Sequence, residues 1–339
     1  MSMSRRQFTQ EMRNWIGYYT GVGPGVGKIF HVATASSAYE TLLKERGFNT
    51  SEIFDTIAEG YAACTASRHD VVCIWPGTYT VTASLAWAKS QTHLVGMGGP
   101  NQRYGPTTAT TGDVKIYCAT ASVDSILSIT GHHVQLRNFQ TQNTYSDNAN
   151  RCDIQIAGKN TYMNGVHARG GNGANQLNHA DGGVPLIVSS GTAGYGNGFL
   201  AENCIFGTSG NSARTVGAGA VLFEGGAAAG FNPVFRHCTL EMRCETSGSS
   251  NPKLVHLAAD YAVDRMLLFD NCVFYSMWEN MGGKVDYAIV DACTTTHSIV
   301  LRQSTMVGID FWCNVNTYCF TDIAEATDQG GEVYAVKVS

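Results

Sequence analysis

Apolar and polar residues alternate in short runs along most of the chain, and polar turn residues separate these runs. In each copy of the pattern, one alternating run ends at a turn residue, usually Asn, and a second run begins after a Cys or another small residue. The clearest copies are 199–206, 234–240, 267–274 and 299–306, and weaker copies are 134–139 and 161–166. Alternation with a period of two predicts β-strands, each with one buried face.

The copies recur at a period of roughly thirty residues, which is typical of repeat architectures. Their turn residues stand at positions 138, 164, 203, 237, 271 and 303. Each repeat is too short for a domain and contains strands without a long amphipathic helix, so leucine-rich and βαβ architectures do not fit. A solenoid of parallel strands remains, with equivalent residues of neighbouring coils about 4.8 Å apart. We expect roughly eight coils from this period.

Stacking of the repeats predicts two columns of side chains. The turn residues would form a polar ladder at one corner, where Asn tolerates the left-handed conformation: Asn203, His237 and Asn271. The residues that follow them would form a thiol column in the core: Cys204, Cys238 and Cys272. We interpret these thiols as packing residues, because no CxxC pair or His partner follows them to indicate a metal or redox role.

The segment before the repeats predicts a helix and two further strands. Thr50 or Ser51 can cap a short amphipathic helix. Its apolar side would consist of Ile53, Phe54, Ile57, Ala58 and Tyr61. An apolar strand at 70–75, a Pro-Gly-Thr-Tyr turn at 76–79 and a strand at 94–98 follow.

This succession of helix, strand, Pro-Gly-Thr-Tyr turn and strand resembles the opening of right-handed parallel β-helix proteins of the pectate-lyase-like superfamily. The resemblance implies an all-β, single-stranded right-handed parallel β-helix over residues 49–310, with a short N-terminal helix that caps the first coil. It says nothing specific about activity, since this scaffold carries lyases, hydrolases, adhesins and viral spikes.

Composition agrees with a fold of strands and turns. Hydrophobic residues make up 44% of the 339 residues and charged residues only 14%, with 38 glycines and 7 prolines, which excludes a helical bundle. The net charge of −5 gives no electrostatic attraction to nucleic acid, and no apolar run is long enough to span a membrane. The twin-arginine-like start lacks an apolar region after it, so we expect no export, and 11 scattered cysteines fit reduced thiols in the host cytoplasm.

The two ends of the chain fall outside the repeat. Residues 1–48 are interpreted as an N-terminal docking arm and a Gly-rich connector, whose Gly-Lys sequence lacks the spacing of a phosphate-binding loop. A helix in the arm would have an apolar face that packs on the solenoid or on a partner: Phe8, Met12, Trp15, Ile16 and Tyr19. Residues 311–339 are interpreted as a C-terminal cap or oligomer contact.

Few residues are candidates for catalysis. The richest polar stretches bring Asp147, Arg151, Asp153, His179 and Asp181 into neighbouring coils, and Asp147, His179 and Asp181 would be the acid and base groups of an enzyme. The motifs of polygalacturonase-type hydrolases and of the related lyases are absent. The alternative interpretation is that these acids cap turns in a Gly-rich loop.

Other polar and aromatic residues have structural interpretations. His132 and His133 are expected in an exposed turn rather than in a metal site. Tyr275 and Trp278 could stack on a sugar ring, but covering the coil edges is the favoured interpretation. We expect no cofactor and no metal.

A β-helix with an extra N-terminal arm, no export signal and no complete catalytic constellation resembles virion proteins of tailed bacteriophages. This resemblance implies a non-enzymatic virion structural protein, either a capsid decoration or a spike or fibre component. We expect it to assemble as a homotrimer and to dock through its termini onto other virion proteins such as the major capsid protein. The alternatives are a polysaccharide-degrading β-helix enzyme, such as a phage depolymerase or lyase, and a carbohydrate-binding adhesin for a host surface glycan.

Overall fold

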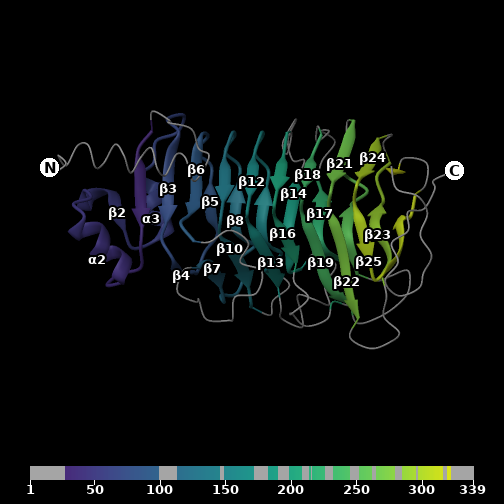
Figure 1. Ribbon diagram of the computed structural model, residues 1–339, viewed down its shortest axis with the longest axis horizontal. Coiled ribbons are helices and arrows are strands. Elements are labelled where there is room, and N and C mark those ends of the chain that lie inside the picture. The colour runs from purple at the N-terminus through teal and green to yellow at the C-terminus, as the bar shows by residue number, and fades with distance from the viewer. Residues whose placement is uncertain are drawn as a thin grey trace.

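The computed structural model describes residues 27–98, 113–145, 149–171, 182–189, 198–207, 214, 216–225, 232–244, 252–261, 265–278, 285–294, 297–315 and 319–321. Three parallel sheets run side by side along the long axis of the molecule, from the N-terminal end with its short helices to the C-terminal end (Figure 1). We call them sheets A, B and C.

Each sheet takes every third strand of the repeat. Sheet A has 11 strands: β2 (Ile53–Phe54), β1 (Ile29–Val32), β3 (Asp70–Ile74), β6 (Thr92–Gly96), β9 (Gln135–Arg137), β12 (Tyr162–Asn164), β15 (Leu200–Glu202), β18 (Val234–Arg236), β21 (Met266–Asp270), β24 (Ser298–Arg302) and β27 (Cys319–Thr321). Sheet B has eight strands: β4 (Gly77–Val81), β7 (Val114–Cys118), β10 (Gln140–Asn143), β13 (His167–Gly171), β16 (Ile205–Gly207), β19 (Thr239–Cys244), β22 (Val273–Trp278) and β25 (Thr305–Val307). Sheet C also has eight strands: β5 (Leu85–Trp87), β8 (Ser125–Ile129), β11 (Cys152–Ile156), β14 (Val184–Ser189), β17 (Ala218–Glu224), β20 (Lys253–Leu257), β23 (Val285–Asp291) and β26 (Ile309–Cys313).

The chain passes from sheet A to B to C and back to A in every coil. The first complete coil is β3, β4 and β5, and the eighth is β24, β25 and β26. Neighbouring strands pair in parallel, as Leu200 with Val234 and Phe235 with Phe269 illustrate. This arrangement confirms the predicted parallel β-helix and its roughly eight coils.

The turn residue of each repeat lies in the left-handed conformation at the corner between sheets A and B. These residues have φ between 49° and 64°: Asn138, Gly165, Asn203, His237, Asn271 and Gln303. The prediction was off by one residue in the second copy, because Asn164 is the last residue of β12 and Gly165 occupies the corner. A Cβ at position 165 would lie 2.6 Å from Oδ1 of Asn138, so a larger residue there would displace the Asn138 side chain, and glycine avoids this.

The predicted thiol column is present in the core. Cys204, Cys238 and Cys272 are each 1% exposed and follow the corner residue in three successive coils. The Cys272 thiol contacts the carbonyl of Phe235 at 3.4 Å, and the Ser304 hydroxyl makes the equivalent contact with Phe269 at 3.3 Å. Burial raises the pKa of the Cys238 thiol, which therefore stays protonated.

Aromatic rings fill the centre of the later coils. Phe235 stacks on Phe269, with the ring centroids 5.0 Å apart, and meets Phe199 edge-on at 5.5 Å. Phe206 and Phe223 approach the same ring from sheets B and C at 5.7 and 6.1 Å. Phe235 is thus the central ring of the core, in contact with aromatic residues from all three sheets.

The N-terminal end differs from the prediction of one helix beginning at Thr50 or Ser51. Two short α-helices are present, α2 (Ala38–Glu45) and α3 (Ile57–Ala63), and a 3₁₀ turn occupies Thr50–Glu52. Ile53 and Phe54 form β2, which pairs with β1, so these two residues lie in a sheet and not in the helix. Helix α3 begins later because Thr56 and Glu59 form a capping box there.

Helix α3 packs against the first strands of sheet A, with Ile57 and Gly60 buried. A Cβ on Gly60 would lie 2.8 Å from Cγ2 of Val32, so glycine allows this close approach. At the other end, the Lys89 ammonium donates to the carbonyls of Tyr61, Ala62 and Cys64 at 2.7–3.0 Å. These charge-assisted bonds satisfy the last carbonyls of the helix and fasten it to the first coil.

The sheets extend beyond both ends of the predicted range 49–310. Strand β1 lies in the segment 1–48, which we expected to be arm and connector, and it pairs directly with β3. Strands β26 and β27 continue sheets C and A into the segment 311–339, which we expected to be a cap. In the described ranges, no helix has the length and apolar character needed to cross a membrane.

Candidate functional site

The predicted acid and base residues lie outside the described residues. This applies to Asp147, His179 and Asp181. It applies equally to the predicted apolar face of the N-terminal arm: Phe8, Met12, Trp15, Ile16 and Tyr19. The side chain of Trp278 lies outside the described part as well.

Two neighbours of the predicted site are described, and both have structural partners. Arg151 forms an ion pair with Glu224, and its Nη1 lies 4.0 Å from Oδ1 of Asp124. Asp153 is fully buried, and its Oδ2 accepts hydrogen bonds of 2.9 Å from the Thr141 hydroxyl and the Gly170 amide. Burial raises the pKa of Asp153 to about 6. Asp153 is therefore a core carboxyl and does not point to an outer groove.

The two histidines lie where their structural interpretation placed them. His133 has a left-handed backbone in an exposed turn, and Nδ1 of His132 accepts a hydrogen bond of 3.1 Å from the Lys159 amide. Tyr275 lies half-buried in β22 of sheet B. These contacts confirm the turn interpretation of the two histidines.

A group of polar side chains lies on the outer face of sheet B, where the sequence had suggested no site. The strands β7, β10, β13 and β19 each place core residues on the inner face, so the alternate residues face outward. We call these outward residues the sheet B polar patch: Lys115, Gln140, Gln142, His167, Arg169 and Glu241. All of them are buried except Arg169, which is half-buried.

Charges of both signs meet in this patch. Lys115, Gln140 and His167 are register partners on three adjacent strands, and Nε2 of His167 lies 3.0 Å from the Gly207 carbonyl oxygen. Burial and the neighbouring Arg169 lower the pKa of Lys115. In the described part of the chain, Nε and Nη1 of Arg169 have no hydrogen-bond partner. The patch thus combines a carboxyl group, an imidazole and two cations, which are groups that bind anions or transfer protons.

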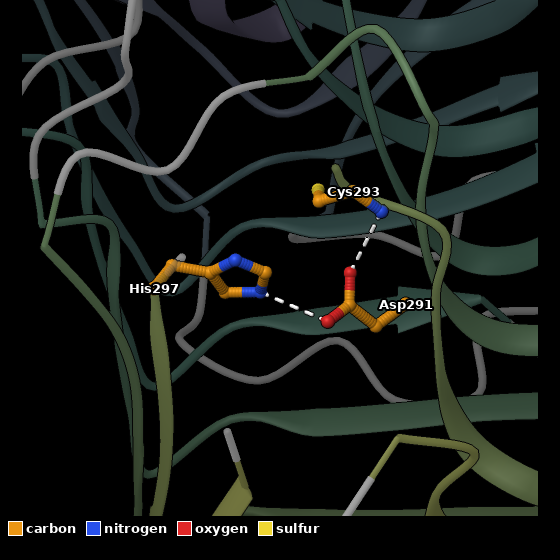
Figure 2. A group of neighbouring side chains, drawn as sticks. All are labelled: Asp291, Cys293 and His297. Carbon is orange, nitrogen blue, oxygen red and sulfur yellow. Dashed lines mark hydrogen bonds and ion pairs between the residues drawn. The ribbon is translucent and has the colours of Figure 1, made fainter. Parts of the chain in front are cut away.

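A second cluster lies at the corner between sheets C and A near the C-terminal end (Figure 2). Asp291 ends β23, Cys293 follows it by two residues, and His297 directly precedes β24. Nε2 of His297 lies 2.9 Å from Oδ2 of Asp291, and the Cys293 amide donates to Oδ1 over 2.9 Å. One ligand atom from each residue can be chosen so that all three lie within 4.8 Å of one another.

The surroundings hold Asp291 in place. Its amide donates to Oδ1 of Asn314 over 2.7 Å, and the Asn314 amide group donates back to the Asp291 carbonyl over 3.1 Å. Burial, followed by the carboxylate of Asp291, raises the pKa of the Cys293 thiol. The sequence signal for this cluster is the Asp-x-Cys-x₃-His spacing, which the search for CxxC pairs could not detect.

Comparisons with known proteins show the fold. No protein-family model matches the sequence, and no curated protein matches it. Among solved structures, a pectin methylesterase in complex with a hexasaccharide matches with a TM-score of 0.52 and 15% identity, over 86% of this chain and 80% of that chain. The pectin methylesterase PemA from Erwinia chrysanthemi matches with a TM-score of 0.50 and 14% identity, over 92% of this chain and 86% of that chain.

A protein of a Geobacillus virus matches with a TM-score of 0.41 and 13% identity, over 93% of this chain and 64% of that chain. Identities this low establish an architecture and no activity. With three parallel sheets and a chain that returns to each of them once per coil, the protein is a parallel β-helix, the fold that it shares with these solved structures.

Proposed function

We propose that this protein is a structural component of a tailed-bacteriophage virion, a capsid decoration or a spike or fibre protein, that assembles with copies of itself. The observation that supports assembly is the position of its exposed apolar side chains. The virion assignment is supported by the parallel β-helix, a scaffold that also carries viral spikes, and synthesis in a host cytoplasm belongs to the same proposal. Docking of the N-terminal arm on another virion protein, such as the major capsid protein, belongs to the same proposal.

Large exposed apolar side chains gather at the C-terminal end. In the described part of the chain they are Tyr145 (38% exposed), Val273 (38%), Val307 (42%), Phe311 (47%) and Phe320 (54%). Three of them belong to the last strands of the three sheets, β25, β26 and β27, and Val273 belongs to β22, which pairs with β25. An excess of large exposed apolar side chains at one end of the molecule favours a protein contact there. Because the residues lie on all three faces of the same end, a second copy of the chain is the partner that we propose.

Replacing Phe311 and Phe320 together by serine is expected to disrupt this assembly. The change removes the two most exposed aromatic side chains from the C-terminal end without touching the core. Light scattering on the purified chain should give an oligomer for the natural sequence and the mass of one chain for the double variant. Tyr145→Ser is the matched control, since it removes an exposed aromatic residue elsewhere, and it should leave the oligomer intact. An oligomer that survives the double substitution would refute the proposed contact.

A carbohydrate ligand is the second candidate function, and the sheet B polar patch favours it. Two guanidinium nitrogens of the half-buried Arg169, Nε and Nη1, have no hydrogen-bond partner among the described residues, and a guanidinium group is suited to the carboxylates of an acidic polysaccharide. The pectin methylesterases that share this fold include one solved with a hexasaccharide.

Calorimetric titration with oligogalacturonates tests this second candidate. We expect Arg169→Gln to weaken binding about tenfold or more, because a charge-assisted contact to a carboxylate is worth about 1.5–3 kcal/mol. Arg236→Gln is the matched control: this arginine lies on the outer face of sheet A, in ion pairs with Glu202 and Asp270. The candidate fails if the natural chain binds no acidic oligosaccharide, or if both variants bind equally.

A further inference from the structure

Figure 2 shows the Asp291 carboxylate and the His297 imidazole pointing toward one another, with the Cys293 backbone amide on the second carboxylate oxygen. The Cys293 thiol donates to the Ala258 carbonyl over 3.6 Å, and one ligand atom from each of the three residues lies within 4.8 Å of the others. Asp291 is the last residue of β23, and Cys293 and His297 lie in the short connection to β24, so the spacing Asp-x-Cys-x₃-His brings them to the same corner. In the described part of the chain, Asp291, Cys293 and His297 form the group of His, Cys and acidic side chains that lie close enough together to hold a metal ion.

The donor set identifies the class of metal. A thiolate, an imidazole and a carboxylate together suit zinc, whereas magnesium and calcium take oxygen ligands only. Zinc binds these groups at about 2.0–2.3 Å, so two of its ligands lie roughly 3.3–3.6 Å apart in a tetrahedral site. The carboxylate and the imidazole are already 2.9 Å apart, and the cluster closes around an ion with small side-chain movements.

The environment of the carboxylate agrees with a bound cation. The side chains of Asp291 and His297 are 2% and 0% exposed, and burying a carboxylate costs free energy unless a positive charge accompanies it. Among the ion pairs of the described residues, the one that includes Asp291 is with His297, with no Lys or Arg involved. A zinc ion would compensate both the carboxylate and the Cys293 thiolate.

The second layer of contacts orients the ligands as in metal sites. The Cys293 amide holds Oδ1 of Asp291, which leaves Oδ2 directed at the imidazole. The side chain of Asn314, which follows β26 of the next coil, bonds both the backbone amide and the backbone carbonyl of Asp291. Hydrogen bonds of this type fix the orientation of ligating carboxylates, and their loss typically weakens metal binding.

We infer that Asp291, Cys293 and His297 form a zinc-binding site that ties the corner between sheets C and A in the last coils. Three protein ligands leave a fourth position for water, and Cys293 is only partly buried, so an ion can reach the site from solvent. The inference does not depend on the proposed virion role, and a metal measurement distinguishes the two.

The test uses the full chain, purified with a reductant and without chelator, then equilibrated with zinc chloride and washed free of excess metal. Emission spectrometry should find about one zinc per chain in the natural protein. Cys293→Ser and His297→Gln should each lower the zinc content about tenfold or more, because each removes one of three ligands. Substitution by cobalt should produce a thiolate-to-cobalt charge-transfer band that Cys293→Ser abolishes.

Cys272→Ser is the matched control for the loss of a buried thiol. Ser304 occupies the equivalent position in the next coil with the same carbonyl contacts, so serine fits there. This variant should keep its zinc and its cobalt band. The site is refuted if the natural chain retains no zinc or cobalt after washing, or if Cys293→Ser and His297→Gln, folded by circular dichroism, retain as much metal as Cys272→Ser does.

Discussion

Replacing Phe235 by alanine is expected to lower the free energy of unfolding by about 3–5 kcal/mol, as large-to-small changes of buried aromatic residues do. The side chain is fully buried and its ring contacts Phe199, Phe206, Phe223 and Phe269. These neighbours belong to three sheets and cannot all move into the cavity. Urea unfolding followed by circular dichroism measures the loss.

Two further variants make this result specific. Phe235→Leu keeps most of the volume and should cost clearly less than the alanine variant. Tyr145→Ala removes a partly exposed ring outside the stacked core and should change stability far less. If Phe235→Ala were no more costly than Tyr145→Ala, the aromatic core of the solenoid would not be packed as described.

Replacing Asp153 by asparagine is expected to raise the stability relative to the natural chain between pH 4 and pH 8, by up to about 3 kcal/mol, since one pKa unit corresponds to 1.36 kcal/mol. Burial raises the pKa of this carboxyl from 3.8 to about 6 in the folded chain. Asparagine has nearly the same shape, and its oxygen can accept the same hydrogen bonds from Thr141 and Gly170. It carries no charge at any pH and so avoids the cost of a buried carboxylate.

The pH dependence of this effect has a definite direction. Below about pH 4 the carboxyl is protonated in both the folded and the unfolded chain, so the contribution of the buried neutral carboxyl to the free energy of unfolding is complete there. Between pH 4 and 6 the unfolded chain ionises first, and this contribution is lost as the pH rises through the folded pKa of about 6. The difference in unfolding free energy between the natural chain and Asp153→Asn should therefore grow from pH 4 to pH 7.

Unfolding by urea at pH 4.5 and at pH 7.5 measures this difference. Asp124→Asn is the matched control, because the Asp124 carboxylate is 54% exposed on the neighbouring coil, and its effect should be nearly the same at both pH values. An Asp153→Asn variant that is equally destabilised at both pH values would show that the carboxyl is not held in the core as a neutral group.

Much of the fold could be predicted from the sequence because a parallel β-helix repeats the same local requirements. The corner residues had to tolerate the left-handed conformation, and Asn203, His237 and Asn271 do so. The thiols that follow them had to be small and apolar, and they are buried in a column. The copy near Asn164 was misplaced by one residue because Asn and Gly are adjacent there and both suit a corner.

The N-terminal end was harder to predict because local signals compete. Ile53 and Phe54 continue the apolar spacing of α3, but they pair with β1, a strand more than twenty positions earlier in the chain that the repeat pattern did not include. The capping box at Thr56 was the local signal that separated strand from helix.

The candidate sites could not be predicted because they depend on distances between coils. The sheet B polar patch combines residues from four strands that are far apart in sequence, and only the register brings Lys115, Gln140 and His167 together. Asp153 was grouped with polar residues that would line a groove or cap turns, yet it lies inside the solenoid and accepts hydrogen bonds from Thr141 and Gly170. The cluster at Asp291 had a spacing signal, but its convergence requires the turn between β23 and β24.

The measurement that tests the proposed assembly most directly is the mass of the full chain in solution, by light scattering over a range of concentrations. The proposal predicts an oligomer, with three times the chain mass of 36.4 kDa as the specific expectation. A mass of 36.4 kDa at every concentration would contradict self-assembly, and the sheet B polar patch with its acidic oligosaccharides would then become the leading account of function.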